Sequence, residues 1–406
     1  ISSAMGSRNL YVNNGAVINN SGTFQFQSGS NDAINRNSGA GTFNNTGSID
    51  SQSAGAAVAN VTLNNTGGTL AASGANNLTI NAPTSHSGAL TISGNNVFLS
   101  GGVQAFADGS SVSGRLNLSG AAATFGSTTV NGLINYTAGS LGIGAGDTLT
   151  AAGGITWATG NAISGPGTLA IPTGQTLALT TTADRVLDNA TLNNAGTISS
   201  AMGSRNLYVN NGAVINNSGL YQSQSGSNDA INTSAGGGTF NNTGGTLEAS
   251  GTNLTIAVGG THGDIDLVGN GVVFTSGTHT VSGQVTAGVG SSFNVSGATM
   301  EFADNSGFNL TGNLNFSSGA INLTGTVTGA TVAAGSTLTL DSKALGGSGK
   351  LTNLGTFNFN NSSIAGTLIN QGTLNINSGS SAINGAAFDL TGGSVTIAGG
   401  ASLSKN

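Results

Sequence analysis

The chain has 406 residues, of which 69 are glycine, three are proline and none is cysteine, and charged residues make up 5%. Only eight Lys and Arg residues and a formal net charge of −6 exclude the basic surface that nucleic-acid binding requires. The absence of cysteine excludes disulfides and thiolate metal sites, and the scarcity of proline excludes collagen. No apolar run is long enough to cross a membrane, so we expect a neutral chain with a thin apolar core.

The first segment of the chain, residues 1–35, recurs almost unchanged as residues 198–232, with 32 of 35 positions identical. Such a long identical stretch indicates duplication of a large unit. The same pattern returns in weaker form near the C-terminus. The repetition predicts three units, 1–197, 198–355 and a partial 356–406, which together form one continuous solenoid.

Within the first unit a shorter repeat appears. The tetrapeptide Asn44-Asn-Thr-Gly47 returns 20 residues later as Asn64-Asn-Thr-Gly67, whereas the second unit contains it once, from Asn241 to Gly244. A globular core rarely tolerates the loss of 20 residues, but a stack of equal coils can lose one and close again, because each coil contacts only its neighbours. The spacing therefore predicts a solenoid whose coil is about 20 residues long.

Short segments of alternating apolar and polar residues follow one another along the whole chain, as in Leu116-Asn-Leu118, Leu314-Asn-Phe316 and Phe357-Asn-Phe359. This is the period of a strand with one buried face, and clusters of Gly, Asn and Ser between the segments are typical of turns. No segment has helical periodicity. The pattern predicts an all-β fold, a right-handed parallel β-helix, with the recurring Asn side chains stacked in amide ladders.

One recurring motif resembles a known group of proteins. The sequences Asn194-Ala-Gly-Thr-Ile198, Asn353-Leu-Gly-Thr-Phe357 and Asn370-Gln-Gly-Thr-Leu374 look like coils of filamentous-haemagglutinin-type adhesins and autotransporter passengers. The resemblance covers most of the chain and implies a secreted bacterial β-solenoid at the cell surface. It carries no functional residue over to this chain.

The densest group of titratable residues is His262-Gly-Asp264-Ile-Asp266. Strand alternation would place His262, Asp264 and Asp266 on one face, where they could bind a cation or share a proton. The competing interpretation is a solvated outer face with Ile265 and Leu267 turned inward or toward the turn. Beyond these weak metal candidates, the sequence predicts no catalytic residue, no metal site and no cofactor.

These patterns favour a non-enzymatic structural or adhesive protein outside the cell, a stiff rod that serves as a fibre or cell-surface component. Neither residues 1–10 nor residues 399–406 have the sequence of a polar cap, so we expect copies to associate head-to-tail or laterally. Further expected partners are surface polysaccharide or another cell, but neither nucleic acid nor a membrane. The alternative is a polysaccharide-active β-helix enzyme or carbohydrate-binding module that uses the face from His262 to Asp266.

Overall fold

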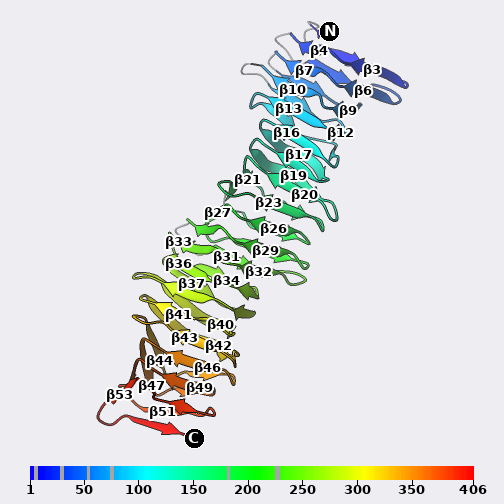
Figure 1. Ribbon diagram of the computed structural model, residues 1–406. Helices are drawn as coiled ribbons and strands as arrows, with labels where there is room; N and C mark the ends of the chain where they lie inside the picture. Colours follow the sequence, from blue (N-terminus) through cyan, green and yellow to red (C-terminus); the bar gives the residue numbers. More distant parts are fainter. Residues whose placement is uncertain (4–7, 28–31, 53–54, 74–76, 181–182, 225–228) are drawn as a thin grey trace. The chain divides into compact units, whose positions relative to one another are not determined.

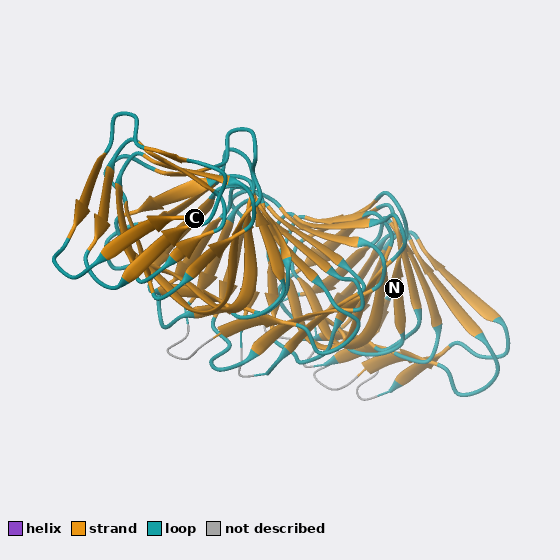
Figure 2. Ribbon diagram, turned by 90° about the horizontal axis from the view of Figure 1, so that it is seen from below, coloured by secondary structure: helices purple, strands orange, loops and turns teal. Residues whose placement is uncertain are grey.

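The structure, a computed structural model, describes residues 1–406 except 4–7, 28–31, 53–54, 74–76, 181–182 and 225–228 (Figure 1). Its described part contains 54 strands and no helix, as Figure 2 shows by the absence of purple ribbon. Parallel stacked coils form a β-solenoid of about 18 turns with about 21 residues per coil. The prediction of an all-β parallel solenoid is confirmed. The chain divides into two compact units, Ile1–Ser199 and Ser200–Asn406, and each is described by itself below.

Each coil contributes one strand to each of three faces, because a strand generally pairs in parallel with the third strand after it. We name a face after its first strand. In the first unit, the β1 face contains β1 (Ser2–Ser3), β4 (Thr23–Phe26), β7 (Ser48–Ser51), β10 (Thr69–Ala72), β13 (Ala89–Ser93), β16 (Ser110–Ser113), β18 (Thr128–Val130), β20 (Thr148–Ala151), β23 (Thr168–Ile171) and β26 (Thr191–Asn194). The β2 face contains β2 (Asn9–Tyr11), β5 (Asp32–Asn35), β8 (Ala56–Val58), β11 (Leu78–Ile80), β14 (Val97–Leu99), β21 (Ile155–Trp157) and β24 (Thr176–Leu179). The β3 face contains β3 (Ala16–Asn20), β6 (Gly41–Asn45), β9 (Thr62–Thr66), β12 (Thr84–Ser87), β15 (Val103–Phe106), β22 (Ile163–Ser164) and β25 (Arg185–Asp188).

The second unit has the same three-faced organisation. Its β28 face contains β28 (Asn206–Asn210), β31 (Asp229–Asn232), β34 (Leu254–Ile256), β37 (Gly271–Phe274), β44 (Thr337–Asp341), β47 (Thr356–Asn360), β50 (Thr373–Ile376) and β53 (Ser394–Ile397). Its β29 face contains β29 (Val214–Asn217), β32 (Thr239–Asn242), β35 (Gly260–His262), β38 (Thr278–Val281), β45 (Ala344–Gly346), β48 (Ser363–Ile364), β51 (Ser380–Ile383) and β54 (Ser402–Lys405). Its β30 face contains β30 (Leu220–Ser223), β33 (Thr246–Ala249), β36 (Ile265–Gly269), β39 (Gln284–Ala287), β41 (Gly307–Leu310), β43 (Ala330–Val332), β46 (Lys350–Asn353), β49 (Thr367–Asn370) and β52 (Phe388–Asp389).

Four long strands turn a corner between two faces: β17 (Leu116–Phe125) and β19 (Ile134–Ile143) in the first unit, β40 (Ser292–Phe302) and β42 (Asn313–Leu323) in the second. Glycine makes the corner possible. In β19 the corner residue Gly139 has a φ of 91°, and a Cβ there would lie 2.0 Å from the carbonyl oxygen of Ala121 in the preceding coil. Only a residue without a side chain can turn here while the coils stay one strand spacing apart.

The interior is filled by every second strand residue, so that buried and less buried positions alternate along most strands. Leu, Ile, Val and Phe predominate, and the large side chains Tyr136 and Trp157 are fully buried there. Most strands thus bury one apolar face, as alternation requires. The core of each unit is a column that lies between its three faces.

Inside this column, asparagines near the ends of strands stack on one another. Asn20 donates a hydrogen bond from Nδ2 to Oδ1 of Asn45 at 2.8 Å, and Asn45 donates in the same way to Asn65 at 2.6 Å. The second unit repeats the arrangement in the pairs Asn217–Asn242 and Asn353–Asn370, both at 2.7 Å. The predicted amide ladders are therefore present, buried just before the turns, where one asparagine amide hydrogen-bonds the next within the core.

Candidate functional site

The predicted cluster from His262 to Asp266 does not form one face. His262 ends β35 and is 2% exposed inside the core, whereas Asp264 and Asp266 are exposed on the outside. The turn between β35 and β36 interrupts the strand alternation on which the prediction relied. Asp264 instead accepts a hydrogen bond from the backbone N–H of Gln284 in the next coil, at 2.8 Å.

The partner of His262 is another histidine, His279, and this pairing was not predicted from the sequence. Their Nε2 and Nδ1 atoms lie 3.0 Å apart, and Nε2 of His279 lies 3.0 Å from the carbonyl oxygen of Ser276. Since a carbonyl can only accept, His279 carries its proton on Nε2, and its Nδ1 accepts from Nε2–H of His262. The only available signal was the separation of 17 residues, which is close to one coil.

The surroundings keep both imidazoles neutral. The phenyl ring of Phe274 packs edge-on against both histidine rings, with its centre 4.8 Å from that of His279, and the centre of the Phe240 ring lies 6.2 Å from that of His262. Burial, together with the neighbouring His279, lowers the pKa of His262 to about 3, and burial also lowers the pKa of His279. The pair is thus a neutral, hydrogen-bonded part of the core, whereas Asp264 and Asp266 are exposed to solvent.

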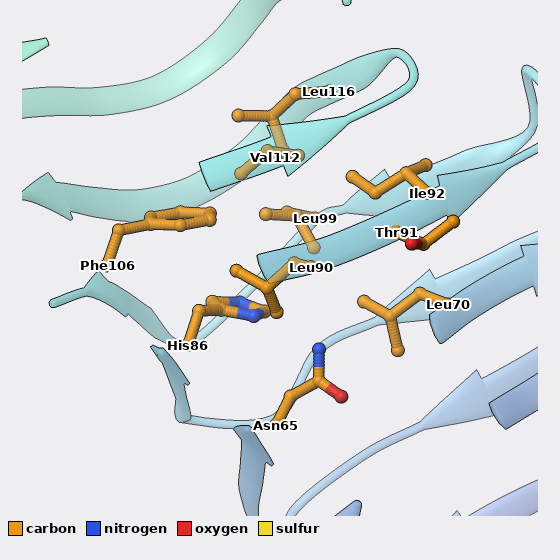
Figure 3. A pocket seen from close by; sticks show the side chains of 10 residues that line it. All are labelled: Asn65, Leu70, His86, Leu90, Thr91, Ile92, Leu99, Phe106, Val112 and Leu116. Atoms are coloured by element: carbon orange, nitrogen blue, oxygen red, sulfur yellow. The ribbon is translucent and has the colours of Figure 1, made fainter. Parts of the chain in front are cut away.

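A third buried histidine, His86, lies in the first unit at the position that follows Asn65 in an asparagine ladder (Figure 3). It lies in register between Asn65 and Phe106 on the β3 face and stacks on the Phe106 ring with a centroid distance of 4.4 Å. Gln104 uses its amide N–H groups on backbone carbonyls, so its Oε1 accepts from Nε2–H of His86 at 3.1 Å. Burial lowers the pKa of His86 to about 4.

The stack borders a small enclosed cavity of about 10 Å³, lined mainly by Leu, Ile, Val and Phe side chains (Figure 3). Nδ2 of Asn65 and Nδ1 of His86 have no hydrogen-bond partner among the described residues and form its polar border. Such a space is about the size of one water molecule. It is too small for an organic ligand, so this histidine too has a place in the core and not in a substrate pocket.

Two hollows open on the outer surface. On the β2 face the outward residues Asn9, Ala33, Ala57 and Thr79 stack in register, and the two alanines leave a shallow trough of about 460 Å³. On the β28 face a groove of about 260 Å³ lies between β42 and β44. Within the residues that the structure describes, no three His, Asp or Glu side chains gather as a metal site would need.

Comparison with known proteins adds no relative: no family model, no curated protein and no solved structure matches the chain. In the described part of the chain, no helix has the length and apolar character to cross a bilayer.

Proposed function

We propose that the chain is a structural or adhesive surface protein, a non-catalytic β-solenoid rod that acts outside the cell. The observation that carries the proposal is the coil-on-coil stacking, in which parallel ladders and buried asparagine columns join equivalent positions of successive coils. In such a stack each coil is held in place by its two neighbours, so the stability of the rod does not depend on one particular site. The resemblance of the N-x-G-T motifs to adhesin coils supports a bacterial cell surface.

The alternative, a polysaccharide-active enzyme or carbohydrate-binding module, used the face from His262 to Asp266. His262 is directed into the core and bonded to His279, so it cannot share a proton or a sugar hydroxyl with Asp264 and Asp266. The geometry of this cluster therefore favours the structural proposal.

We further propose that copies associate head-to-tail through their outermost coils. The coil formed by β52, β53 and β54 leaves apolar side chains uncovered, with Leu390 46% and Ile397 48% exposed. In the first unit, Ile1 is 70% and Val17 is 55% exposed. Strand β54 pairs with β51 and, among the described residues, with no other strand, so its second edge can extend a ladder into another copy.

Sedimentation velocity over a range of concentrations tests this association. We expect concentration-dependent growth of species larger than one chain, and we expect I397K to raise the concentration at which they form by at least about tenfold, because the lysine must lose its hydration in the interface. V289K is the matched control, since Val289 is an apolar residue that is 90% exposed in a turn. A single monomeric species at every concentration, or equal effects of the two substitutions, would contradict the proposal.

A further inference from the structure

The main-chain ladder of the β28 face is interrupted within the second unit. The first half of β42 pairs with β40, from Ser292–Asn313 to Val295–Phe316, but β44 begins a separate four-stranded sheet with β47, β50 and β53. On the other two faces the strands of the same two coils do pair, β41 with β43 and the second half of β42 with β45. Among the described residues, the facing edges of β42 and β44 therefore have no ladder partner.

The interruption uncovers residues that occupy core positions. Leu314 and Phe316 are in register with Phe293 and Val295, which are fully buried, yet both are only half-buried. They form one wall of the groove between β42 and β44, which is lined by Leu314, Asn315, Phe316, Ser317, Thr339, Asp341 and Lys343. On its far side, Leu338 and Leu340 point inward from β44.

The outward amide ladder is interrupted at the same place. Asn315 donates to Asn294 in the preceding coil at 2.5 Å, and on the other side of the groove Asn358 donates to the hydroxyl oxygen of Thr339 at 3.1 Å. Both sides of the groove thus have the order apolar, Asn or Thr, apolar, as Leu314-Asn-Phe316 and Leu338-Thr-Leu340. A segment that completed both ladders would need this order too.

One side chain spans the groove. Nζ of Lys343 donates to the carbonyl oxygen of Ser317 at 2.9 Å, and the ammonium lies 5.4 Å from the centre of the Phe316 ring. The Lys343 side chain thus covers the face of the Phe316 ring and hydrogen-bonds the Ser317 carbonyl at the end of the unpaired edge of β42. Lys343 and Asp341 carry opposite charges, so the lining favours a segment without net charge.

We propose that this groove accepts one extended, uncharged peptide segment as an added β-strand, with apolar residues at two alternate positions and Asn or Thr between them. Two unpaired strand edges supply main-chain hydrogen bonds, and the half-buried Leu314 and Phe316 supply apolar contact. The segment displaces the side chain of Lys343. This binding site goes beyond the structural function proposed above, since a rod needs no gap in one of its faces.

The test is the binding of a fluorescein-labelled peptide with the sequence of residues 354–361, Leu-Gly-Thr-Phe-Asn-Phe-Asn-Asn, to the full chain, measured by fluorescence anisotropy. We expect saturable binding, and at least about tenfold weaker binding of a peptide with proline at the central Asn, because proline lacks the N–H that the ladder uses. K343A should bind the peptide about three to ten times more tightly, since it frees the Ser317 carbonyl and the Phe316 ring.

Lys350 provides the matched control, because its exposed ammonium also donates to a backbone carbonyl, that of Val327, at 2.9 Å, away from the groove lining. K350A should leave the affinity unchanged, and F316A should weaken it. The proposal is overturned if neither the wild type nor K343A binds the peptide, if the proline peptide binds equally well, or if K350A and K343A have the same effect. Both lysines are on the surface, so loss of the fold does not confuse the comparison.

Discussion

Lowering the pH from 7 to 4 is expected to reduce the free energy of unfolding by at least about 6 kcal/mol, because His86 and His262 are buried in neutral form and His279 acts in the same direction. In the unfolded chain a histidine binds a proton near pH 6.5, whereas in the folded chain the pKa is about 4 for His86 and about 3 for His262. Between these values the unfolded state binds more protons, so each histidine destabilises the fold by about 1.4 kcal/mol per unit of falling pH. The effect begins below about pH 6.5 and is absent above it.

Urea unfolding at pH 7, 5.5 and 4 measures this loss. H86F should remove the part of the loss that is due to His86, about 3 kcal/mol, because phenylalanine extends the ring stack of Phe106 and Phe125 without a proton to bind. The measurements stop at pH 4 so that they report on the histidines alone. Hydrogen bonds from Gly329 and Thr391 lower the pKa values of the exposed Asp304 and Asp389, so the stability that these carboxylates contribute is lost only below pH 4. Equal stability at pH 7 and pH 4 would show that the histidines are not buried as described.

The substitution G139A is expected to destabilise the chain by about 4 kcal/mol. Alanine at a φ of 91° costs about 1–2 kcal/mol, and its Cβ would press on the carbonyl of Ala121, which belongs to the adjoining strand and cannot retreat without breaking the ladder. Urea unfolding at neutral pH gives the value.

The control is G146A, which separates conformational strain from steric contact. Gly146 has a φ of 79°, and no atom lies within 4 Å of a Cβ built there. We expect G146A to lower the free energy of unfolding by about 1 kcal/mol, because only the conformational strain remains. If the two substitutions reduce the free energy of unfolding by the same amount, the coils do not approach each other as closely at the corner of β19 as described.

The solenoid could be predicted from the sequence because the pattern that specifies one coil is repeated along the chain. Alternation in segments such as Leu116-Asn-Leu118 specifies inward and outward positions, and the 20-residue spacing of Asn44 and Asn64 specifies the coil. The structure places Asn44 and Asn64 in direct register and bonds their amides at 2.8 Å. Local pattern and long-range contact agree here because each coil repeats the one before it.

The candidate site was predicted less well, because it depends on where turns interrupt the alternation. A turn after His262 reverses its side relative to Asp264, and no local sequence signal distinguishes this from a continuous strand. The pairing of His262 with His279 depends on the length of one particular coil. The ladder break before β44 is equally hidden, since Leu338-Thr-Leu340 alternates like any paired strand.

The coils are interchangeable units stacked in register, and removal of one coil tests this property most directly. Deleting residues 45–64 joins Asn44 to Asn65 and restores the sequence Asn-Asn-Thr-Gly at the junction. Urea unfolding monitored by circular dichroism should show one cooperative transition with a free energy within about 2 kcal/mol of the full chain, because the neighbouring coils close on each other. Deleting only residues 45–54 leaves one coil at half its length, so its strands lose their register with the preceding coil. This variant should lose far more stability than the whole-coil deletion, or unfold in two separate transitions. If the whole-coil deletion is as damaging as the half-coil deletion, the stacked-coil account is contradicted.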